Sequence, residues 1–131
     1  MPATVRLRDS VEIDFDNGPA IVADATAPDS ETTAIYSHAH GDHLYRTPPA
    51  TACWSAATRE LAALRRADVP LPDAATDPPI PLVDAGHVPG SRAAVIEGPD
   101  ETVLYTGDVC TRDRFYLTGF DPPSADVLVI E

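Results

Sequence analysis

The chain has 131 residues, so it holds at most one domain or part of a larger one. It contains no apolar run near the roughly 20 residues that a membrane helix needs, and its first residues lack the apolar segment of a secretory signal. A soluble cytoplasmic protein without a membrane partner is therefore expected. Its two cysteines, Cys53 and Cys110, match no metal or redox spacing, so we expect reduced thiols, with a disulfide as the alternative.

The charge is strongly negative and unusual in its make-up. Acidic residues number 21 against nine basic ones, a net charge of −12, and all nine basic residues are arginine. Self-repulsion at this charge density destabilises a compact chain in dilute salt, whereas molar salt shortens the Debye length to about 3 Å. The composition indicates a halophilic protein, with an ordinary acidic protein as the alternative. A strongly acidic protein usually does not bind nucleic acid. In a salt-adapted protein the whole surface is acidic, so the net charge does not exclude a nucleic-acid partner.

The first part of the chain is predicted to be mostly strands. Alternating and short apolar runs predict strands at 4–8, 11–15, 20–24, 33–37 and 50–54. The "DNG" stretch at 16–18 indicates a tight turn. Ser55 is a suitable N-cap for a helix over 56–67, in which Arg65 and Arg66 close the last turn.

The second part begins with a proline-rich loop over 68–79. Further strands are predicted at 80–86, 92–98, 102–108 and 125–131, of which the second and third form a hairpin. The fold class is therefore α/β, with strands dominating and one clear helix. Histidines and aspartates follow the ends of these strands, where functional loops on a rigid sheet usually lie.

The "SHAHGDH" stretch at 37–43 holds three of the four histidines. If the strand direction persists, His38 and His40 point to the same face and both bind one metal ion, at roughly 2.0–2.1 Å for zinc. Gly41 lets the chain turn sharply, so that Asp42 and His43 face a second metal position. Packing alone does not explain so many histidines in one short stretch.

Two later residues can complete these sites. His87, in "DAGHVPGS", would give the first metal its third histidine. Asp108, in "YTGD", would bridge two metals about 3.5–4 Å apart through its two carboxylate oxygens. A lone histidine is usually a surface or core residue, and "TGD" alone suits a simple turn, but the nearby cluster favours ligand roles. For Cys110 we expect a buried thiol and not a ligand.

His38, His40, Asp42 and His43 match the H-x-H-x-D-H signature, and with it the chain resembles the metallo-β-lactamase superfamily. "DAGHVPGS" and "YTGDV" resemble the next two metal motifs of that family. The resemblance implies an αββα sandwich with two zinc ions at the sheet edges, held by His38, His40, Asp42, His43, His87 and Asp108.

Within this superfamily the chain is most similar to the β-CASP branch. "AGHVPGS", "YTGDVCTRDRFYL" and "DPPSADVLVIE" carry the similarity, whereas glyoxalase-type members usually have a second histidine, as in "HTPGH". The branch contains RNA 3′-end processing endonucleases, RNase J type enzymes and DNA cross-link repair nucleases. The resemblance implies a catalytic role for Glu131 at the site rim, although the family's Ser/Thr-Thr-Tyr-Gly stretch does not follow it.

The similarity covers only the N-terminal half of such a domain. The β-CASP insertion, the second half of the sandwich and the last zinc-binding histidine are outside the chain. We therefore expect residues 1–131 to self-associate, to pair with the missing half or to be poorly stable. We also expect a weak nuclease, because the second metal lacks a histidine and the general acid would come from that half.

The expected function is that of a zinc-dependent phosphodiesterase, specifically an RNA-processing nuclease acting on RNA or DNA. Asp42 would orient or deprotonate the attacking water. Two alternatives remain open: a hydrolase of small esters or thioesters, and a truncated, inactive metal-binding domain.

Overall fold

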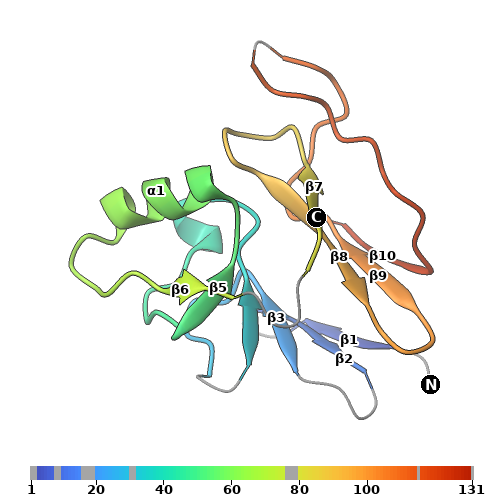
Figure 1. Ribbon diagram of the computed structural model, residues 1–131, viewed down its shortest axis with the longest axis horizontal. Helices are drawn as coiled ribbons and strands as arrows, with labels where there is room; N and C mark the ends of the chain where they lie inside the picture. Colours follow the sequence, from blue (N-terminus) through green and yellow to red (C-terminus); the bar gives the residue numbers. More distant parts are fainter. Residues whose placement is uncertain are drawn as a thin grey trace.

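The computed structural model describes residues 3–7, 10–15, 20–29, 32–75, 80–114 and 116–130. These residues form two β-sheets and a single α-helix (Figure 1), so the expected α/β class with dominant strands is confirmed. No helix within these ranges is long and apolar enough to cross a membrane. The "DNG" turn and Glu131 fall outside the described residues.

The first sheet is six-stranded, with its strands in sequence order. They are β1 (Thr4–Leu7), β2 (Val11–Asp14), β3 (Ile21–Ala23), β4 (Thr33–Ile35), β5 (Thr51–Cys53) and β6 (Asp73–Ala74). Neighbours are antiparallel from β1 to β3 and parallel from β3 to β6.

Two features of this sheet differ from the prediction. β6 lies inside the segment 68–79 that was predicted to be loop, because Asp73 and Ala74 pair with β5. β1 was expected to be half-buried, but all its residues are exposed, since it is the edge strand of the sheet. By contrast, β2 buries alternate residues as its sequence pattern predicted.

The second sheet is four-stranded. In spatial order it contains β10 (Val127–Val129), β9 (Thr102–Tyr105), β8 (Arg92–Glu97) and β7 (Leu82–Asp84). The predicted hairpin is confirmed, because β8 and β9 are antiparallel and Gly98 N donates to Glu101 O at 2.8 Å. β10 pairs with the other edge of β9, and these two strands are parallel. Within the described residues, the strands β2 to β5 and β7 to β10 are shorter than their sequence patterns suggested.

The helix α1 (Ala56–Arg65) lies beside the six-stranded sheet (Figure 1). Its N-cap is Ser55, as predicted, because the Ser55 side chain accepts a hydrogen bond from Thr58 N at 3.1 Å. The helix buries Thr58 and Ala62, while Leu64 is 77% exposed. Ala62 belongs to a cluster with residues on the outer face of the six-stranded sheet, including Val22, Ala34 and Ala52.

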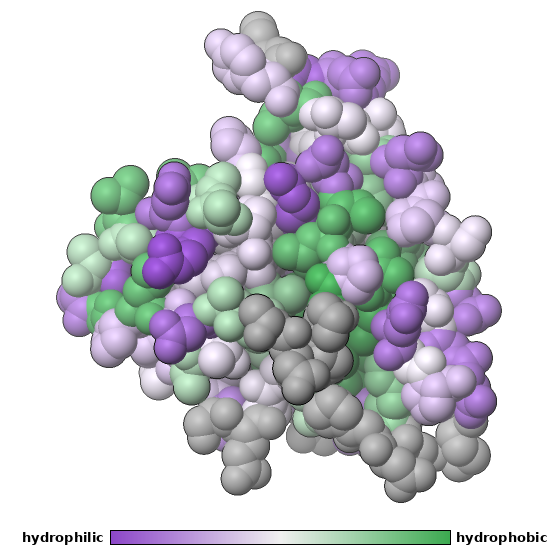
Figure 2. Space-filling view, in the orientation of Figure 1, coloured by the Kyte–Doolittle hydropathy of each residue, from purple (hydrophilic) through white to green (hydrophobic). Residues whose placement is uncertain are grey.

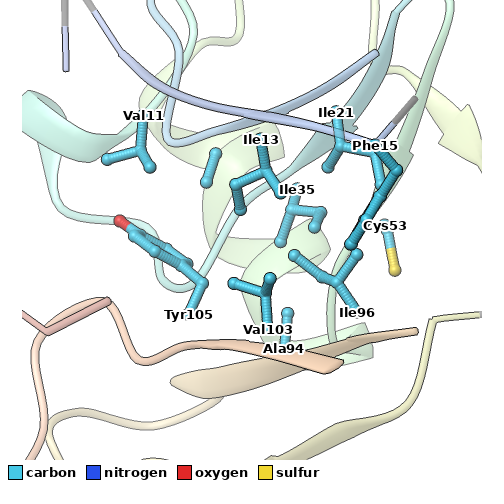
Figure 3. Packing of buried hydrophobic residues seen from close by; sticks show 11 residues of the cluster. Val11, Ile13, Phe15, Ile21, Ile35, Cys53, Ala94, Ile96, Val103 and Tyr105 are labelled. Atoms are coloured by element: carbon cyan, nitrogen blue, oxygen red, sulfur yellow. The ribbon is translucent and has the colours of Figure 1, made fainter. Parts of the chain in front are cut away.

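The main core fills the space between the two sheets (Figure 3). The six-stranded sheet and its loops contribute Val11, Ile13, Phe15, Ile21, Ala23, Ile35 and Cys53, and the other sheet contributes Ala94, Ile96, Val103 and Tyr105. Burying each large apolar side chain stabilises the fold by roughly 1.5–3 kcal/mol. Both cysteines are free thiols, as expected, but Cys110 is only half-buried.

The outer face of the four-stranded sheet is partly open. Val127 and Val129 of β10 pack against the main core, whereas Leu128 and the following Ile130 are 57% and 60% exposed. Figure 2 shows hydrophobic side chains gathered over this part of the molecule. The apolar pattern of β10 is therefore covered on one face only.

Candidate metal centre

Residues at the ends of four strands converge on one edge of the two sheets. The histidine cluster follows β4, His87 follows β7 and Asp108 follows β9. A further acid, Asp24, follows β3, and because β3 and β4 are parallel neighbours it lies beside Ser37. The candidate site therefore lies at the ends of strands from both sheets, where the sequence pattern placed it.

Four of the predicted ligands form one compact group. His38, His40, His87 and Asp108 each offer one ligand atom, and these atoms all lie within 4.8 Å of one another. His87 Nε2 is 3.3 Å from His40 Nδ1, and Asp108 Oδ2 is 3.4 Å from His87 Nε2 and 3.5 Å from His38 Nε2. Ligands at 2.0–2.1 Å in a tetrahedral site are about 3.3–3.4 Å apart. The group therefore has the dimensions of a site for one metal ion.

The state of His38 supports this interpretation. Its side chain is fully buried, and its Nε2 has no hydrogen-bond partner among the described residues. A buried polar atom without a partner is costly, and a metal ion at this position would remove the cost. Burial lowers the pKa of His38 to about 4 and also lowers the pKa of His87, which favours the neutral imidazole that binds metals.

The other two predicted ligands lie next to this group. His43 Nε2 is 3.7 Å from Asp108 Oδ2 and 3.6 Å from Asp42 Oδ2. The Asp42 carboxylate is 82% exposed, so it lies at the rim of the site. Asp108 Oδ2 therefore lies between His38 and His87 on one side and His43 on the other, and the predicted bridging of two metals through both carboxylate oxygens remains a prediction. Glu131 is outside the described residues, and its role remains a prediction.

Asp24 is the residue of this site that the sequence analysis missed. It is 7% exposed, and its Oδ1 accepts a hydrogen bond from Ser37 N at 2.8 Å. Its Oδ2 accepts from Ser37 Oγ at 2.7 Å and from Tyr105 OH at 2.6 Å, and lies 3.0 Å from His43 Nδ1. The available signal was an aspartate directly after an apolar strand, the same signal that identified Asp108.

Asp24 determines which ring nitrogens are free to bind metal. An ionised carboxylate only accepts hydrogen bonds, so His43 Nδ1 carries the proton and its Nε2 keeps a lone pair. Ser37 Oγ gives its proton to Asp24, so it accepts from His38 Nδ1 at 2.8 Å. His38 and His43 therefore both present Nε2 to the site. The ligand atoms of Asp24, His38 and His43 also lie close enough together to hold a metal ion, but both carboxylate oxygens of Asp24 already accept hydrogen bonds.

The loop after β4 differs from its predicted conformation. β4 ends at Ile35, so the strand does not continue through His38 and His40, yet their ring centroids are 4.8 Å apart. Residues Gly41–His43 form a short 3₁₀ turn, η1, and Gly41 is not one of the described glycines with positive φ. The turn thus does not need the special backbone freedom of glycine.

Two other loops are held in place by specific contacts. Ser91 Oγ accepts from His87 N at 3.1 Å, and Arg114 Nη2 donates to the carbonyls of Gly86 and His87, both at 2.8 Å. Gly107 has a φ of 56°, and a Cβ there would lie 2.5 Å from Ser37 Cβ. Only glycine allows this close approach, which brings Asp108 next to the histidine cluster.

No protein-family model matches this chain, and a search of the curated proteins finds no match. The described side chains form groups able to hold a metal ion.

Proposed function

We propose that this chain is a zinc-dependent phosphodiesterase-type hydrolase, and specifically an RNA-processing nuclease of the β-CASP type. The observation that carries the proposal is the arrangement of three histidines and a shared aspartate at metal-ligand spacing. The motif resemblance described above adds the choice of substrate class.

The arrangement of layers supports a metallo-β-lactamase-type sandwich. α1, the six-stranded sheet and the four-stranded sheet lie in that order, with one apolar cluster between helix and sheet and another between the two sheets. In the proposed fold these would be three successive layers of an αββα sandwich. The partly open outer face, with Leu128 and Ile130 exposed, is where the fourth layer would pack.

The donor set is suited to zinc. Three imidazoles and one carboxylate favour zinc over magnesium or calcium, which prefer oxygen ligands. His38, His40, His87 and Asp108 would hold one ion, and Asp42, His43 and Asp108 would face a second. Bound zinc supplies Lewis-acid polarisation of a phosphoryl oxygen and stabilises the negative charge that develops there.

The remaining chemistry belongs to side chains of this chain. Asp42 is an exposed carboxylate at the rim, where it can orient an attacking water and accept its proton. The water oxygen then forms a bond to phosphorus while the bond to the leaving oxygen breaks, and the leaving oxygen takes up a proton from solvent, because no general acid is assigned within this chain. Asp24 and Ser37 do not touch the substrate, but they hold the rings of His43 and His38 in position throughout. The exposure of Asp42 leaves this side accessible to a polymer.

Metal content is the first test. Protein prepared without chelators should hold one or two equivalents of zinc by elemental analysis, and His38→Ala should lose most of it. Asp121→Ala, at an exposed position outside the cluster, is the control. Absence of metal from the wild type, with no change in His38→Ala, would contradict the metal centre.

Activity is the second test. In molar KCl, the zinc-loaded protein should cleave labelled single-stranded RNA and not a thioester, and Asp42→Ala should lower the rate by about 10²–10⁴. Asp121→Ala should leave the rate unchanged. Preferential thioester hydrolysis would favour the small-molecule hydrolase, and bound zinc without turnover of either substrate would favour an inactive metal-binding domain.

A further inference from the structure

A surface pocket of about 440 Å³ lies at the C-terminal end of α1. Arg46, Arg65 and Arg66 line it, together with Asp68 and Val69. Three positive charges and one negative charge give the pocket lining a formal charge of +2, in a chain whose net charge is −12. The pocket lining is therefore positively charged, whereas the protein as a whole is strongly negative.

The arginines of this pocket are not used in ion pairs. Among the described residues, no carboxylate forms an ion pair with Arg46, Arg65 or Arg66, although Asp68 lines the same pocket. Arg46 and Arg65 are exposed, and their guanidinium groups have no hydrogen-bond partner within the described ranges. In a chain with 21 acidic residues, arginines without acidic partners remain available for an external anion.

Arg66 connects the pocket directly to the metal loop. Its Nε donates to Tyr45 O at 2.8 Å, its Nη2 to Gly41 O at 3.1 Å and its Nη1 to Arg65 O at 3.3 Å. A guanidinium has five N–H donors, so two remain after these three bonds. Because Gly41 stands between His40 and Asp42 in the chain, Arg66 is anchored to the loop that carries the predicted ligands.

We propose that this arginine pocket binds a phosphate group of a nucleic-acid strand whose neighbouring segment lies at the metal centre. This inference rests on the proposed nuclease function. The planar guanidinium matches the geometry of phosphate oxygens and binds them through paired hydrogen bonds. A helix C-terminus carries about half a negative charge, which favours Arg65 and Arg66 at the end of α1 but does not explain Arg46, which lies outside the helix.

The test measures binding separately from catalysis. Fluorescence anisotropy of a labelled 12-nucleotide single-stranded RNA is recorded with excess EDTA, at the lowest KCl concentration that keeps the protein folded by circular dichroism. Arg46→Ala and Arg65→Ala should each weaken binding about tenfold. Each should also reduce the slope of log K against log salt by about 0.7. Arg66 is left unchanged because it holds the metal loop.

Arg59→Ala is the matched control, because Arg59 is exposed on the same helix and does not line the pocket. It should bind RNA like the wild type. Equal losses in all three variants would mean that general charge and not the pocket attracts RNA, and no loss in Arg46→Ala and Arg65→Ala would exclude the pocket. Either result overturns the inference.

Inorganic phosphate, titrated in place of RNA, distinguishes the source of the ligand. Tighter binding of RNA than of phosphate, with the difference abolished in Arg65→Ala, supports a nucleic-acid strand, whereas equal affinity for both overturns that assignment. Zinc-dependent RNA cleavage is read separately. If the protein cleaves RNA but the pocket variants bind RNA like the wild type, the proposed function stands and this inference is rejected. If binding depends on the pocket but no RNA is cleaved, the proposed nuclease function is rejected and the phosphate-binding pocket stands.

Discussion

The Asp24 carboxylate lies 3.0 Å from Nδ1 of His43, on the side of the ring opposite the nitrogen that faces Asp42 and Asp108. The same carboxylate accepts the hydroxyl proton of Ser37, whose oxygen contacts His38 Nδ1. Asp24 therefore orients His43 directly and His38 through Ser37. Such outer contacts commonly change metal affinity by 10–100-fold.

The first prediction follows from this relationship. Asp24→Asn keeps the size of the side chain but removes the charge that holds the proton on His43 Nδ1. We expect the zinc affinity to fall about 10–100-fold, measured by competition with a chromogenic chelator. Asp121→Asn, an exposed exchange of the same type, should leave it unchanged. Wild-type affinity in Asp24→Asn, with an unchanged circular dichroism spectrum, would show that Asp24 has only a packing role.

The second prediction concerns protonation of the metal-free protein. Burial lowers the pKa of His38 from 6.5 to about 4, so the folded state favours the neutral ring. The resulting stability is fully present above pH 6.5 and is lost as the pH falls toward 4. His87 contributes in the same direction.

Histidine NMR signals followed against pH in the presence of a chelator provide the measurement. The signal that is absent from His38→Gln should have its titration midpoint near pH 4. Urea unfolding should also show lower stability at pH 5 than at pH 7. A midpoint of His38 near its ordinary value would mean that this ring is open to water in solution.

The third prediction concerns salt. With a net charge of −12 and no lysine, the folded chain is destabilised by repulsion in dilute buffer. The melting temperature should rise steeply from dilute buffer to molar KCl, and sucrose at equal osmolality should raise it less. A melting temperature that stays flat across this range would point to an ordinary acidic protein.

The fourth prediction concerns the open face of the four-stranded sheet. Leu128 and Ile130 are 57% and 60% exposed on one side of β10, and exposed apolar patches favour association. We expect residues 1–131 alone to be larger than a monomer by light scattering. Replacing Leu128 and Ile130 by serine should shift the chain toward monomer, whereas Leu64→Ser, at a 77% exposed position on α1, should not. A monomeric wild type would contradict this expectation.

The fifth prediction concerns the two thiols. Burial raises the pKa of Cys53, which is 7% exposed, so its thiolate is scarce and shielded. Iodoacetamide should modify the half-buried Cys110 in the native protein and Cys53 only after unfolding, as read by mass spectrometry. In Cys110→Ser, rapid labelling of the native protein would show that the core around Cys53 opens readily.

Local sequence patterns predicted most of the elements and most residues of the candidate site. Alternating apolar residues predicted β2, and Ser55 predicted the start of α1, because both depend on neighbours only a few residues away. His38, His40 and His43 drew attention for the same reason, since one short stretch carries all of them. Their compact grouping with His87 and Asp108 agrees with the prediction that these residues follow the ends of strands.

The distant residues that support this site are brought together by packing between the elements. Asp24 and Tyr105 are 81 positions apart, yet they share a 2.6 Å hydrogen bond because the two sheets face each other. Arg66 reaches Gly41 only because α1 ends beside the metal loop, and Asp73 pairs with β5 only because the chain returns to that edge. Local patterns carry no information about such neighbours, since packing between elements, and not spacing along the chain, brings them together.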